Sequence, residues 1–392
     1  MSYSLINGIV SDELAMALKR ILILGGYGNF GKRIAEGLAN QAGAEIIIAG
    51  RNLALAEQIA RELAKGKCLA KIQAVSVDIQ NPDFQETLVR LAPGLVIHTA
   101  GPFQGQDYKV PLACIAAGCH YLDLADDRRF VCDIVTLHEQ ARQKNVLIVS
   151  GASSVPGLSS TVVDLYRNEF SQIDKIDFCI VPGNKTERGV ATIQGILSYT
   201  GHAYRVYTNG AWKNTYGWLS PRRLDIGGAL GKRWLANVDI PDLELFPSHY
   251  APVRTVRFQA GLELAVLHWA MVIMALLARS GLVRNWANYV KPIYSMSNLF
   301  NGFGTDTGGM QILIRGIGHD KQMKSVKWTL VAKNGIGPYV PTLSVIILAK
   351  KLMNGELSYS GAMPCLGMYT LEEFDQIAAG LGIYHTTEIT TG

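Results

Sequence analysis

Residues 20–31 read RILILGGYGNFG, an apolar run that leads into a glycine-rich turn. The apolar run predicts a buried strand, and Lys32–Asn40 after the turn predicts a helix. Gly26, Gly28 and Gly31 have the G-x-G-x-x-G spacing, which allows a tight turn, close approach to a pyrophosphate and close helix–strand packing. Phosphates bind free N–H groups at such a helix N-terminus. We therefore expect a dinucleotide site; the alternative is a tight turn without a ligand.

The second predicted strand, Glu45–Ala49, does not end in the acidic residue that is typical of an NAD site. A carboxylate there would bond the ribose 2′-hydroxyl of NAD. This chain continues instead with Gly50, Arg51 and Asn52. A guanidinium can hold a 2′-phosphate through two hydrogen bonds. The sequence therefore favours NADP over NAD, unless Arg51 is an ordinary surface residue at a strand end.

The stretch from residue 20 to residue 150 alternates between strand-like and helix-like runs. The strand-like runs are Ile21–Leu24, Ile46–Ala49, Ile72–Val77, Leu95–Thr99, Tyr121–Leu124 and Val146–Ser150. Five helix-like runs lie between them, so the pattern predicts a Rossmann-type, doubly wound parallel sheet of the α/β class. Ligands of such sheets bind at the carboxyl ends of the strands.

Beyond residue 150 the pattern changes and predicts a second, α+β domain with a mainly antiparallel sheet. Pro156–Arg167 predicts a helix, and Ile173–Val181 and Lys324–Ala332 alternate like sheet strands. We expect a dinucleotide-binding domain at residues 1–150, a second domain at 151–330 and a C-terminal segment at 331–392.

One segment of the second domain, Leu264–Ala278, is apolar apart from His268. Glu263 and Arg279 bound it, and it is shorter than the roughly 20 residues that cross a bilayer. We expect a helix that is buried on all sides, in a core or in a dimer interface. The alternative is peripheral attachment to a membrane, without an integral span.

The composition and the distribution of charge argue against several classes of protein. The net charge is +5 without a basic run, which argues against a nucleic-acid surface. The six cysteines include no C-x-x-C pair and are typical of a reducing cytosol. Cys114, Cys119 and His120 lie close in sequence, but core packing is the favoured interpretation and no metal site is expected. Met1–Lys19 shows no signal peptide, so we expect a cytoplasmic protein.

Four motifs carry a family resemblance: Gly25–Gly31 (GGYGNFG), His98–Phe103 (HTAGPF), Ala113–Asp127 (ACIAAGCHYLDLADD) and Ser150–Leu158 (SGASSVPGL). In this order they resemble the saccharopine dehydrogenase-like oxidoreductases, which include saccharopine reductase. The resemblance implies a Rossmann domain, an α/β domain for substrate binding and dimerisation, and a C-terminal segment that returns to the Rossmann domain. Enzymes of the family reduce, or form by reductive coupling, C–N bonds between amino acids and aldehydes with NAD(P)H.

For the cofactor, the resemblance implies contacts from the loops that follow the strands. These are Gly26, Tyr27, Gly28, Asn29, Phe30 and Gly31 at the pyrophosphate; Arg51 and Asn52 at the ribose or 2′-phosphate; Asp78 and Ile79 at the adenine; Thr99, Ala100, Gly101 and Pro102 at the nicotinamide half; and Asp123, Ala125 and Ser153 near the carboxamide. The second domain shows no recognisable cluster for the carboxylates of saccharopine, which leaves the substrate open.

Hydride transfer to an imine or a carbonyl also needs a group that supplies a proton or stabilises negative charge. The candidates near the strand ends are Asp126, Asp127, Ser153 and Tyr108. Each has a structural alternative: helix capping for Asp126, Asp127 and Ser153, and packing on a helix for Tyr108. Arg188, Arg222 and Arg223 are candidates for holding substrate carboxylates or are surface residues.

The extended short-chain dehydrogenases share the glycine motif but need Tyr-x-x-x-Lys, and none of the 16 tyrosines has a lysine four residues later. We therefore expect an NADP-dependent oxidoreductase that acts at a C–N or C=O bond of a small amino-acid-like substrate, as a homodimer. The alternative is a non-catalytic NADP-binding sensor or scaffold.

Overall fold

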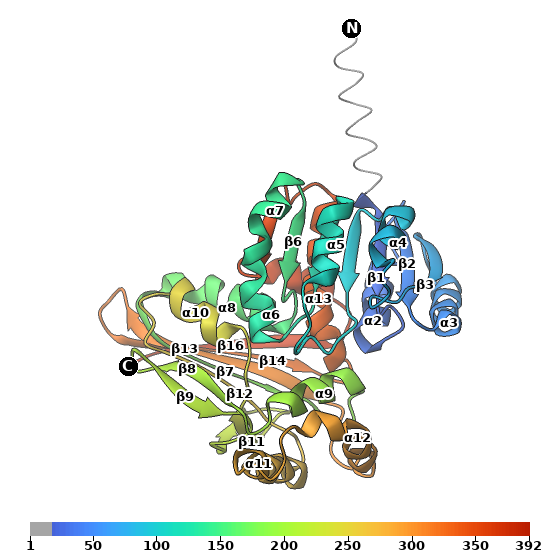
Figure 1. Cartoon of the computed structure of the whole chain (residues 1–392). Coiled ribbons are helices and arrows are strands. Elements are labelled where there is room, and N and C mark those ends of the chain that lie inside the picture. The colour runs from blue at the N-terminus through green and yellow to red at the C-terminus, as the bar shows by residue number, and fades with distance from the viewer. Residues whose placement is uncertain (1–17) are drawn as a thin grey trace. The chain divides into compact units, whose positions relative to one another are not determined.

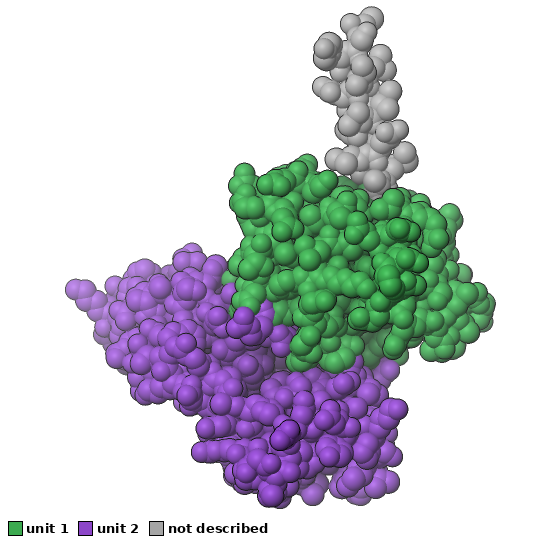
Figure 2. Space-filling model, viewed as in Figure 1, with its two compact units in different colours: residues 1–125, 130–157, 341–369 green, residues 126–129, 158–340, 370–392 purple. Residues whose placement is uncertain are grey.

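The structure is a computed structural model that describes residues 18–392 (Figure 1). The expectation for the first 17 residues therefore lies outside the described residues. The chain divides into two compact units (Figure 2). Unit 1 comprises the residues up to 125 together with 130–157 and 341–369, and unit 2 comprises 126–129, 158–340 and 370–392.

Unit 1 contains a seven-stranded sheet in the order β15-β6-β5-β4-β1-β2-β3, and all of its neighbouring strands are parallel. The strands are β1 (Arg20–Leu24), β2 (Glu45–Gly50), β3 (Lys71–Ser76), β4 (Leu95–His98), β5 (His120–Asp123), β6 (Leu147–Ser150) and β15 (Gly361–Pro364). The central strands are apolar on both faces because helices cover both faces of the sheet. The predicted doubly wound parallel sheet is confirmed, with one more strand than the sequence indicated.

Seven α-helices among residues 18–392 belong to unit 1, and two of them show clear capping residues. They are α2 (Asn29–Leu38), α3 (Leu53–Ala64), α4 (Phe84–Leu91), α5 (Lys109–Ala117), α6 (Arg128–Cys132, which starts in unit 2), α7 (His138–Gln143) and α13 (Val340–Met353). The side chain of Asn52 caps α3 by accepting a hydrogen bond from the N–H of Leu55 (3.2 Å). Gly118 ends α5 in the left-handed conformation (φ 72°).

The C-terminal segment is divided between the two units. After α13, strand β15 pairs with β6 in unit 1. The chain then continues into α14 (Leu371–Ala378) and β16 (Ile383–Thr391), and β16 pairs with β14 (Met323–Ala332) in unit 2. The segment 341–369 thus joins the Rossmann-type sheet, and residues 370–392 complete the other sheet.

Unit 2 is built on a second seven-stranded sheet in the order β10-β11-β12-β7-β13-β14-β16. Its further strands are β7 (Phe170–Val181), β10 (Arg222–Asp225), β11 (Lys232–Asn237), β12 (Thr255–Ala260) and β13 (Gly308–Gly318), and a separate hairpin is formed by β8 (Ala203–Thr208) and β9 (Ala211–Tyr216). All neighbours are antiparallel except β12 and β7, so the mainly antiparallel sheet that the sequence predicts is present.

The remaining helices of unit 2 are α8 (Ser159–Tyr166), α9 (Val190–Tyr199), α10 (Asp242–His249), α11 (Ala265–Arg279) and α12 (Val290–Asn298). The apolar segment of the sequence forms α11, but it is not buried on all sides of this chain. His268, Met271, Val272 and Ala275 are buried, whereas several large apolar residues on the other side are exposed. The helix is apolar on both sides, so the pattern could not indicate which side packs. Within residues 18–392, no helix combines the length and the apolar character that a bilayer crossing needs.

Candidate dinucleotide site

The glycine loop between β1 and α2 is compact because its backbone bonds to itself and to β2. The N–H of Gly28 donates to the carbonyl oxygen of Gly25 (2.8 Å), and the N–H of Gly26 donates to that of Ala49 (3.0 Å). Gly25 has a positive φ of 76°, which favours glycine. A Cβ atom on Gly31 would lie 2.3 Å from the carbonyl oxygen of Gly25. This turn therefore needs a glycine at the third position of the motif.

The N-terminus of α2 is open to a ligand. Its N-cap is Gly28, which has no side chain to cap the helix. In the described part of the chain, the N–H groups of Asn29, Phe30 and Gly31 have no backbone acceptor, while the N–H of Lys32 already bonds Gly28. Free N–H groups and the positive end of the helix dipole suit a pyrophosphate.

The end of β2 is shaped by a tyrosine from the glycine loop. A Cβ on Gly50 would lie 2.4 Å from the ring of Tyr27, so the ring packs directly on the backbone there. The hydroxyl of Tyr27 accepts a hydrogen bond from the N–H of Asn52 (3.2 Å). Arg51 lies between these two contacts and is exposed. Among the described residues its guanidinium has no hydrogen bond or ion pair, so it can take an anionic ligand.

The loop after β3 borders a small cavity. Asp78 is exposed and its carboxylate accepts a hydrogen bond from the N–H of Gln80 (3.0 Å), while Ile79 is half-buried. The cavity measures about 210 Å³ and is lined by Ile79, Gln80, Gly105, Gln106, Asp107, Lys109 and Val110. One of the two predicted adenine-side residues thus lines a cavity within unit 1.

The loop after β4 is fixed by one side chain that the sequence did not indicate. The amide of Gln106 donates to the carbonyl oxygens of Ala100 (3.0 Å) and Pro102 (2.7 Å). The hydroxyl of Thr99 donates to the carbonyl oxygen of Leu24 (2.8 Å), at the end of β1. Thr99 and Ala100 therefore lie beside Gly25 at the start of the glycine loop. The contact of Thr99, Ala100, Gly101 and Pro102 with the nicotinamide half stays a prediction. Gln106 lies six and four residues after the two residues whose carbonyl oxygens it binds. No recognisable sequence pattern marks such a glutamine, so its role could not be predicted.

Asp123 supports the loops after β5 and β6 from inside. Its carboxylate accepts hydrogen bonds from the N–H of Gly151 (2.8 Å), the N–H of Ala125 (2.9 Å) and the hydroxyl of Ser150 (3.0 Å). Asp123 and Ala125 are fully buried, so they lie beneath the surface of these loops and support them from below. Burial raises the pKa of Asp123 to about 6, against the opposing effect of these hydrogen bonds.

A buried histidine and tyrosine lie beside this carboxylate. Nδ1 of His98 is 3.0 Å from the hydroxyl oxygen of Tyr121, and the ring of His98 packs edge-on against Phe103. Burial lowers the pKa of His98 to about 4, so the imidazole is neutral at physiological pH. His98 is the first residue of the HTAGPF motif, but no pattern in the sequence indicates a role for it.

Two of the predicted catalytic residues, Tyr108 and Ser153, lie in unit 1. The hydroxyl of Tyr108 donates to the carbonyl oxygen of Phe130 (2.8 Å), and the two rings pack at 5.0 Å. Ser153 is nearly buried, and its carbonyl oxygen accepts a hydrogen bond from Ser344 of α13 (2.9 Å). Its hydroxyl has no hydrogen bond among the described residues. Ser153 is thus the better placed donor, and the catalytic role of both residues stays a prediction.

The other two candidates, Asp126 and Asp127, fall in unit 2. They precede Arg128, which forms an ion pair with Asp239 and donates to the carbonyl oxygen of Arg205 (2.9 Å). Burial raises the pKa of Asp239 to about 6, and the negative charge of Asp127 contributes to that rise. Asp127 therefore belongs to a charged cluster in unit 2, and its catalytic role also stays a prediction.

Two of the three arginine candidates of unit 2, Arg188 and Arg222, are already engaged, whereas Arg223 is exposed. Arg222 binds Asp177 through two hydrogen bonds (2.7 and 3.2 Å). Arg188 donates to the side chain of Asn301 (2.8 Å). Neither guanidinium is free to hold a substrate carboxylate without giving up a partner. In residues 18–392, no group of three or more His, Cys, Asp or Glu side chains could hold a metal ion, and Cys114 and Cys119 lie in the hydrophobic core.

Comparison with known proteins agrees with this geometry. Residues 21–149 match the family model of the saccharopine dehydrogenase NADP binding domain. The fold is similar to apo saccharopine dehydrogenase (L-Glu forming) from Saccharomyces cerevisiae, with a TM-score of 0.66 over 95% of this chain and 99% of the yeast chain. The identity to that protein is 12%, so this likeness concerns the fold.

Two curated relatives come from Mycobacterium tuberculosis strains H37Rv and CDC 1551. Both carry the name "Putative trans-acting enoyl reductase" and are 31% identical to this chain over 140 residues. The match covers 35% of this chain and 33% of each relative, so it spans about a third of their length.

Fold and site together define an NAD(P)-binding protein with a Rossmann-type unit and a mixed-sheet unit. Residues 21–149 therefore form a domain of the saccharopine dehydrogenase NADP binding type, and the fold of the chain is similar to that of yeast saccharopine dehydrogenase.

Proposed function

We propose that this chain is an NADPH-dependent oxidoreductase that acts at a C–N or C=O bond of a small amino-acid-like substrate. The observation that carries the proposal is the open N-terminus of α2, where three N–H groups and a tight glycine turn form a cradle for a pyrophosphate. The match of residues 21–149 to an NADP binding domain supports it. Bound NADPH would supply the hydride.

The preference for NADP over NAD rests on the end of β2. Arg51 is exposed and its guanidinium has no partner among the described residues, and neither Gly50 nor Asn52 supplies a carboxylate. A free guanidinium attracts a 2′-phosphate, while a carboxylate at this place would repel one.

The residues of unit 1 suggest how a proton would reach the product. Ser153 follows β6, and its hydroxyl has no hydrogen bond within residues 18–392, so it can donate to a nitrogen or oxygen that gains negative charge during reduction. Tyr108 would first have to release the carbonyl oxygen of Phe130. We therefore assign the donor role to Ser153 ahead of Tyr108.

A second candidate reaction is reduction of a carbon–carbon double bond conjugated to a carbonyl group. The specific observation in its favour is the 31% identity to proteins named as enoyl reductases. The non-catalytic sensor or scaffold remains the alternative outside enzymes.

One experiment separates these proposals. NADPH and NADH binding is measured by titration, and NADPH oxidation is followed with amino acids paired with aldehydes, with α-keto acids and with an enoyl thioester. We expect NADPH to bind more tightly and one of the first two substrate classes to give steady turnover. Turnover with the enoyl thioester alone would favour the second candidate. NADPH binding without turnover in any class would favour the sensor.

We also propose a homodimer that forms through unit 2. Sedimentation of the purified chain measures its mass directly. A strictly monomeric mass over a wide concentration range would contradict the proposal.

A further inference from the structure

Residues 264–305 leave the sheet of unit 2 after β12 and return to it at β13; we call them the excursion. They contain α11, the 3-10 turn Trp286–Tyr289 and α12. The excursion has three cationic residues, Arg279, Arg284 and Lys291, and no Asp or Glu. At the chain's average frequency of acidic residues, a segment of this length would contain about three.

The excursion also holds a large share of the exposed apolar side chains. Nine of the 22 large hydrophobic residues that are exposed in the described part of the chain lie in it. They are Val266, Trp269, Ile273, Leu276, Leu282, Tyr289, Met296, Leu299 and Phe303. A concentration of this kind on one segment marks an interaction surface, whereas scattered apolar residues need no explanation.

Four of these residues form one stripe along α11. Val266, Trp269, Ile273 and Leu276 recur every three or four positions and are 57%, 39%, 56% and 51% exposed. The opposite side of the helix is buried in unit 2. Packing against unit 2 therefore uses only one side of α11 and leaves the stripe available.

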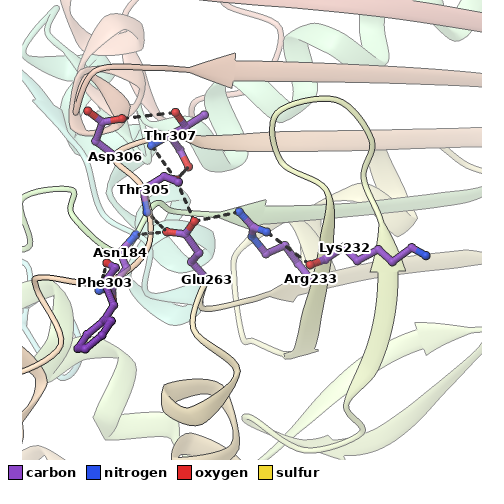
Figure 3. Close-up of polar contacts among 8 residues, drawn as sticks. All are labelled: Asn184, Lys232, Arg233, Glu263, Phe303, Thr305, Asp306 and Thr307. Carbon is purple, nitrogen blue, oxygen red and sulfur yellow. Dashed lines mark hydrogen bonds and ion pairs between the residues drawn. The ribbon is translucent and has the colours of Figure 1, made fainter.

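The two ends of the excursion are joined by the side chain of Glu263, the residue that precedes it (Figure 3). One carboxylate oxygen of Glu263 accepts hydrogen bonds from the N–H groups of Asn184 and Thr305 (both 2.8 Å). The other accepts from the hydroxyl of Thr305 (2.8 Å) and pairs with Arg233 (3.3 Å). The excursion thus begins and ends at one fixed point.

Further hydrogen bonds fix its interior. The side chain of Asn184 donates to the carbonyl oxygens of Phe300 (2.7 Å) and Phe303 (3.0 Å). The indole N–H of Trp286 donates to the carbonyl oxygen of Met274 (2.7 Å), which ties the 3-10 turn to α11. The exposed apolar residues therefore belong to an element that side-chain hydrogen bonds hold in place.

We propose that the excursion docks this protein on the surface of an anionic phospholipid bilayer. Exposed Leu, Ile, Met and Phe side chains would enter the boundary between headgroups and acyl chains, and Trp269 and Tyr289 suit that depth. The three cations, with no acidic residue among them, are attracted to anionic lipid. The proposal is independent of the proposed reaction.

The same charges argue against a second copy of the chain as the occupant. In a two-fold symmetric contact, the same patch lies on both subunits. Such a contact would bring the cations of one excursion close to those of the other, with no acidic residue in either excursion to offset them. An anionic membrane offers the opposite charge and needs no matching shape.

The test uses the full chain and flotation with vesicles of phosphatidylcholine, with and without a quarter of phosphatidylglycerol. We expect the wild type to float with the anionic vesicles, less so as salt rises. Ile273→Ser with Leu276→Ser should weaken this binding at least about tenfold, because two apolar side chains would be lost from the stripe. The matched control is Met323→Ser with Ile389→Ser, at residues of the same unit that are 53% and 49% exposed; it should bind like the wild type.

Three results would overturn the proposal. The wild type could fail to bind either kind of vesicle. The Ile273→Ser, Leu276→Ser variant could bind as tightly as the wild type with an unchanged circular dichroism spectrum and melting curve. Finally, the wild type could be a dimer that this variant converts to a monomer, without vesicle binding, which would assign the surface to a second copy. A further variant, Arg284→Glu with Lys291→Glu, should remove the preference for anionic vesicles.

Discussion

The hydroxyl of Thr99 donates hydrogen bonds to the carbonyl oxygens of Leu24 (2.8 Å) and Gly25 (3.1 Å). These bonds join the end of β4 to the start of the glycine loop, although the two segments are 75 positions apart in sequence. The loop that we assign to the pyrophosphate and the loop that we assign to the nicotinamide half are therefore fixed to each other by one side chain.

Replacement of Thr99 by Val should loosen this connection while keeping the shape of the side chain. The carbonyl oxygen of Leu24 keeps the N–H of Thr99 as a donor (2.9 Å), so no buried acceptor is left without a partner. We expect a loss of about 1 kcal/mol in the free energy of unfolding. NADPH binding, measured by titration, should weaken as well. Thr99→Ser keeps the hydroxyl and should restore both values; equal effects of the two variants would contradict the role of the hydroxyl.

Gly31→Ala should damage the site more severely. The added Cβ would lie 2.3 Å from the carbonyl oxygen of Gly25 and 2.7 Å from Cα of Gly26, both in the backbone of the loop. The loop must shift, and overpacking of this kind costs about 1 to 3 kcal/mol. We expect NADPH affinity to fall at least about tenfold in the same titration.

The matched control for this variant is Gly66→Ala in the same unit. A Cβ on Gly66 would meet only the carbonyl oxygen of Leu63 at 3.5 Å, an ordinary contact. The control should bind NADPH like the wild type. A Gly31→Ala protein that binds NADPH normally would show that the loop does not hold the pyrophosphate.

Arg51→Ala tests the choice between the two cofactors. Loss of the guanidinium should weaken NADPH binding by roughly tenfold and leave NADH binding nearly unchanged, because only NADPH carries the 2′-phosphate. Arg61→Ala is a suitable control, since Arg61 is an exposed arginine of the following helix and pairs with Glu57. Equal losses for both cofactors would contradict a 2′-phosphate contact.

Ser153→Ala and Tyr108→Phe separate the two candidate proton donors. Once a substrate is known, Ser153→Ala should lower kcat at least about tenfold, with NADPH affinity little changed. Tyr108→Phe removes a hydrogen bond to the backbone of Phe130 and should lower the melting temperature with a smaller effect on kcat. If Tyr108→Phe lowered kcat more than Ser153→Ala did, Tyr108 would be the proton donor instead.

The part of the fold that the sequence predicts best is the part with strong local patterns. Strands such as β1 and β2 are continuous apolar runs between helix signals, and the structure confirms them to within a residue or two. Strand β15 reads only Gly-Ala-Met-Pro and has no periodicity, so its place beside β6 could not be predicted. That strand is set by long-range packing of the segment after α13.

The candidate site shows the same division. The glycine spacing identifies the turn, because a Cβ atom at each of these positions would lie too close to the neighbouring backbone. The support from Gln106, Tyr27 and Ser344 depends on contacts between distant segments, which no local pattern records. Asp123 belongs to a motif of the family resemblance, but only the structure shows that its carboxylate is buried.

The buried carboxylate of Asp123 should make the stability of unit 1 depend on pH. Its pKa is about 6 in the folded chain and 3.8 in the unfolded chain, so the folded chain binds the proton more tightly. The stabilisation from this proton is fully present below pH 3.8 and is lost as the pH rises through about 6. The difference between the two limits is about 3 kcal/mol in the free energy of unfolding. Asp123→Asn is neutral at every pH and should remove this contribution.

The measurement is denaturant unfolding of wild type and Asp123→Asn at a series of pH values between 4 and 7. Because Asp239 and Asp242 in unit 2 also have raised pKa values, the informative quantity is the difference between the two proteins at each pH. As the pH rises, the free energy of unfolding of Asp123→Asn should increase relative to that of the wild type. Parallel pH profiles for wild type and Asp123→Asn would show that the Asp123 carboxyl group keeps an ordinary pKa in the folded chain.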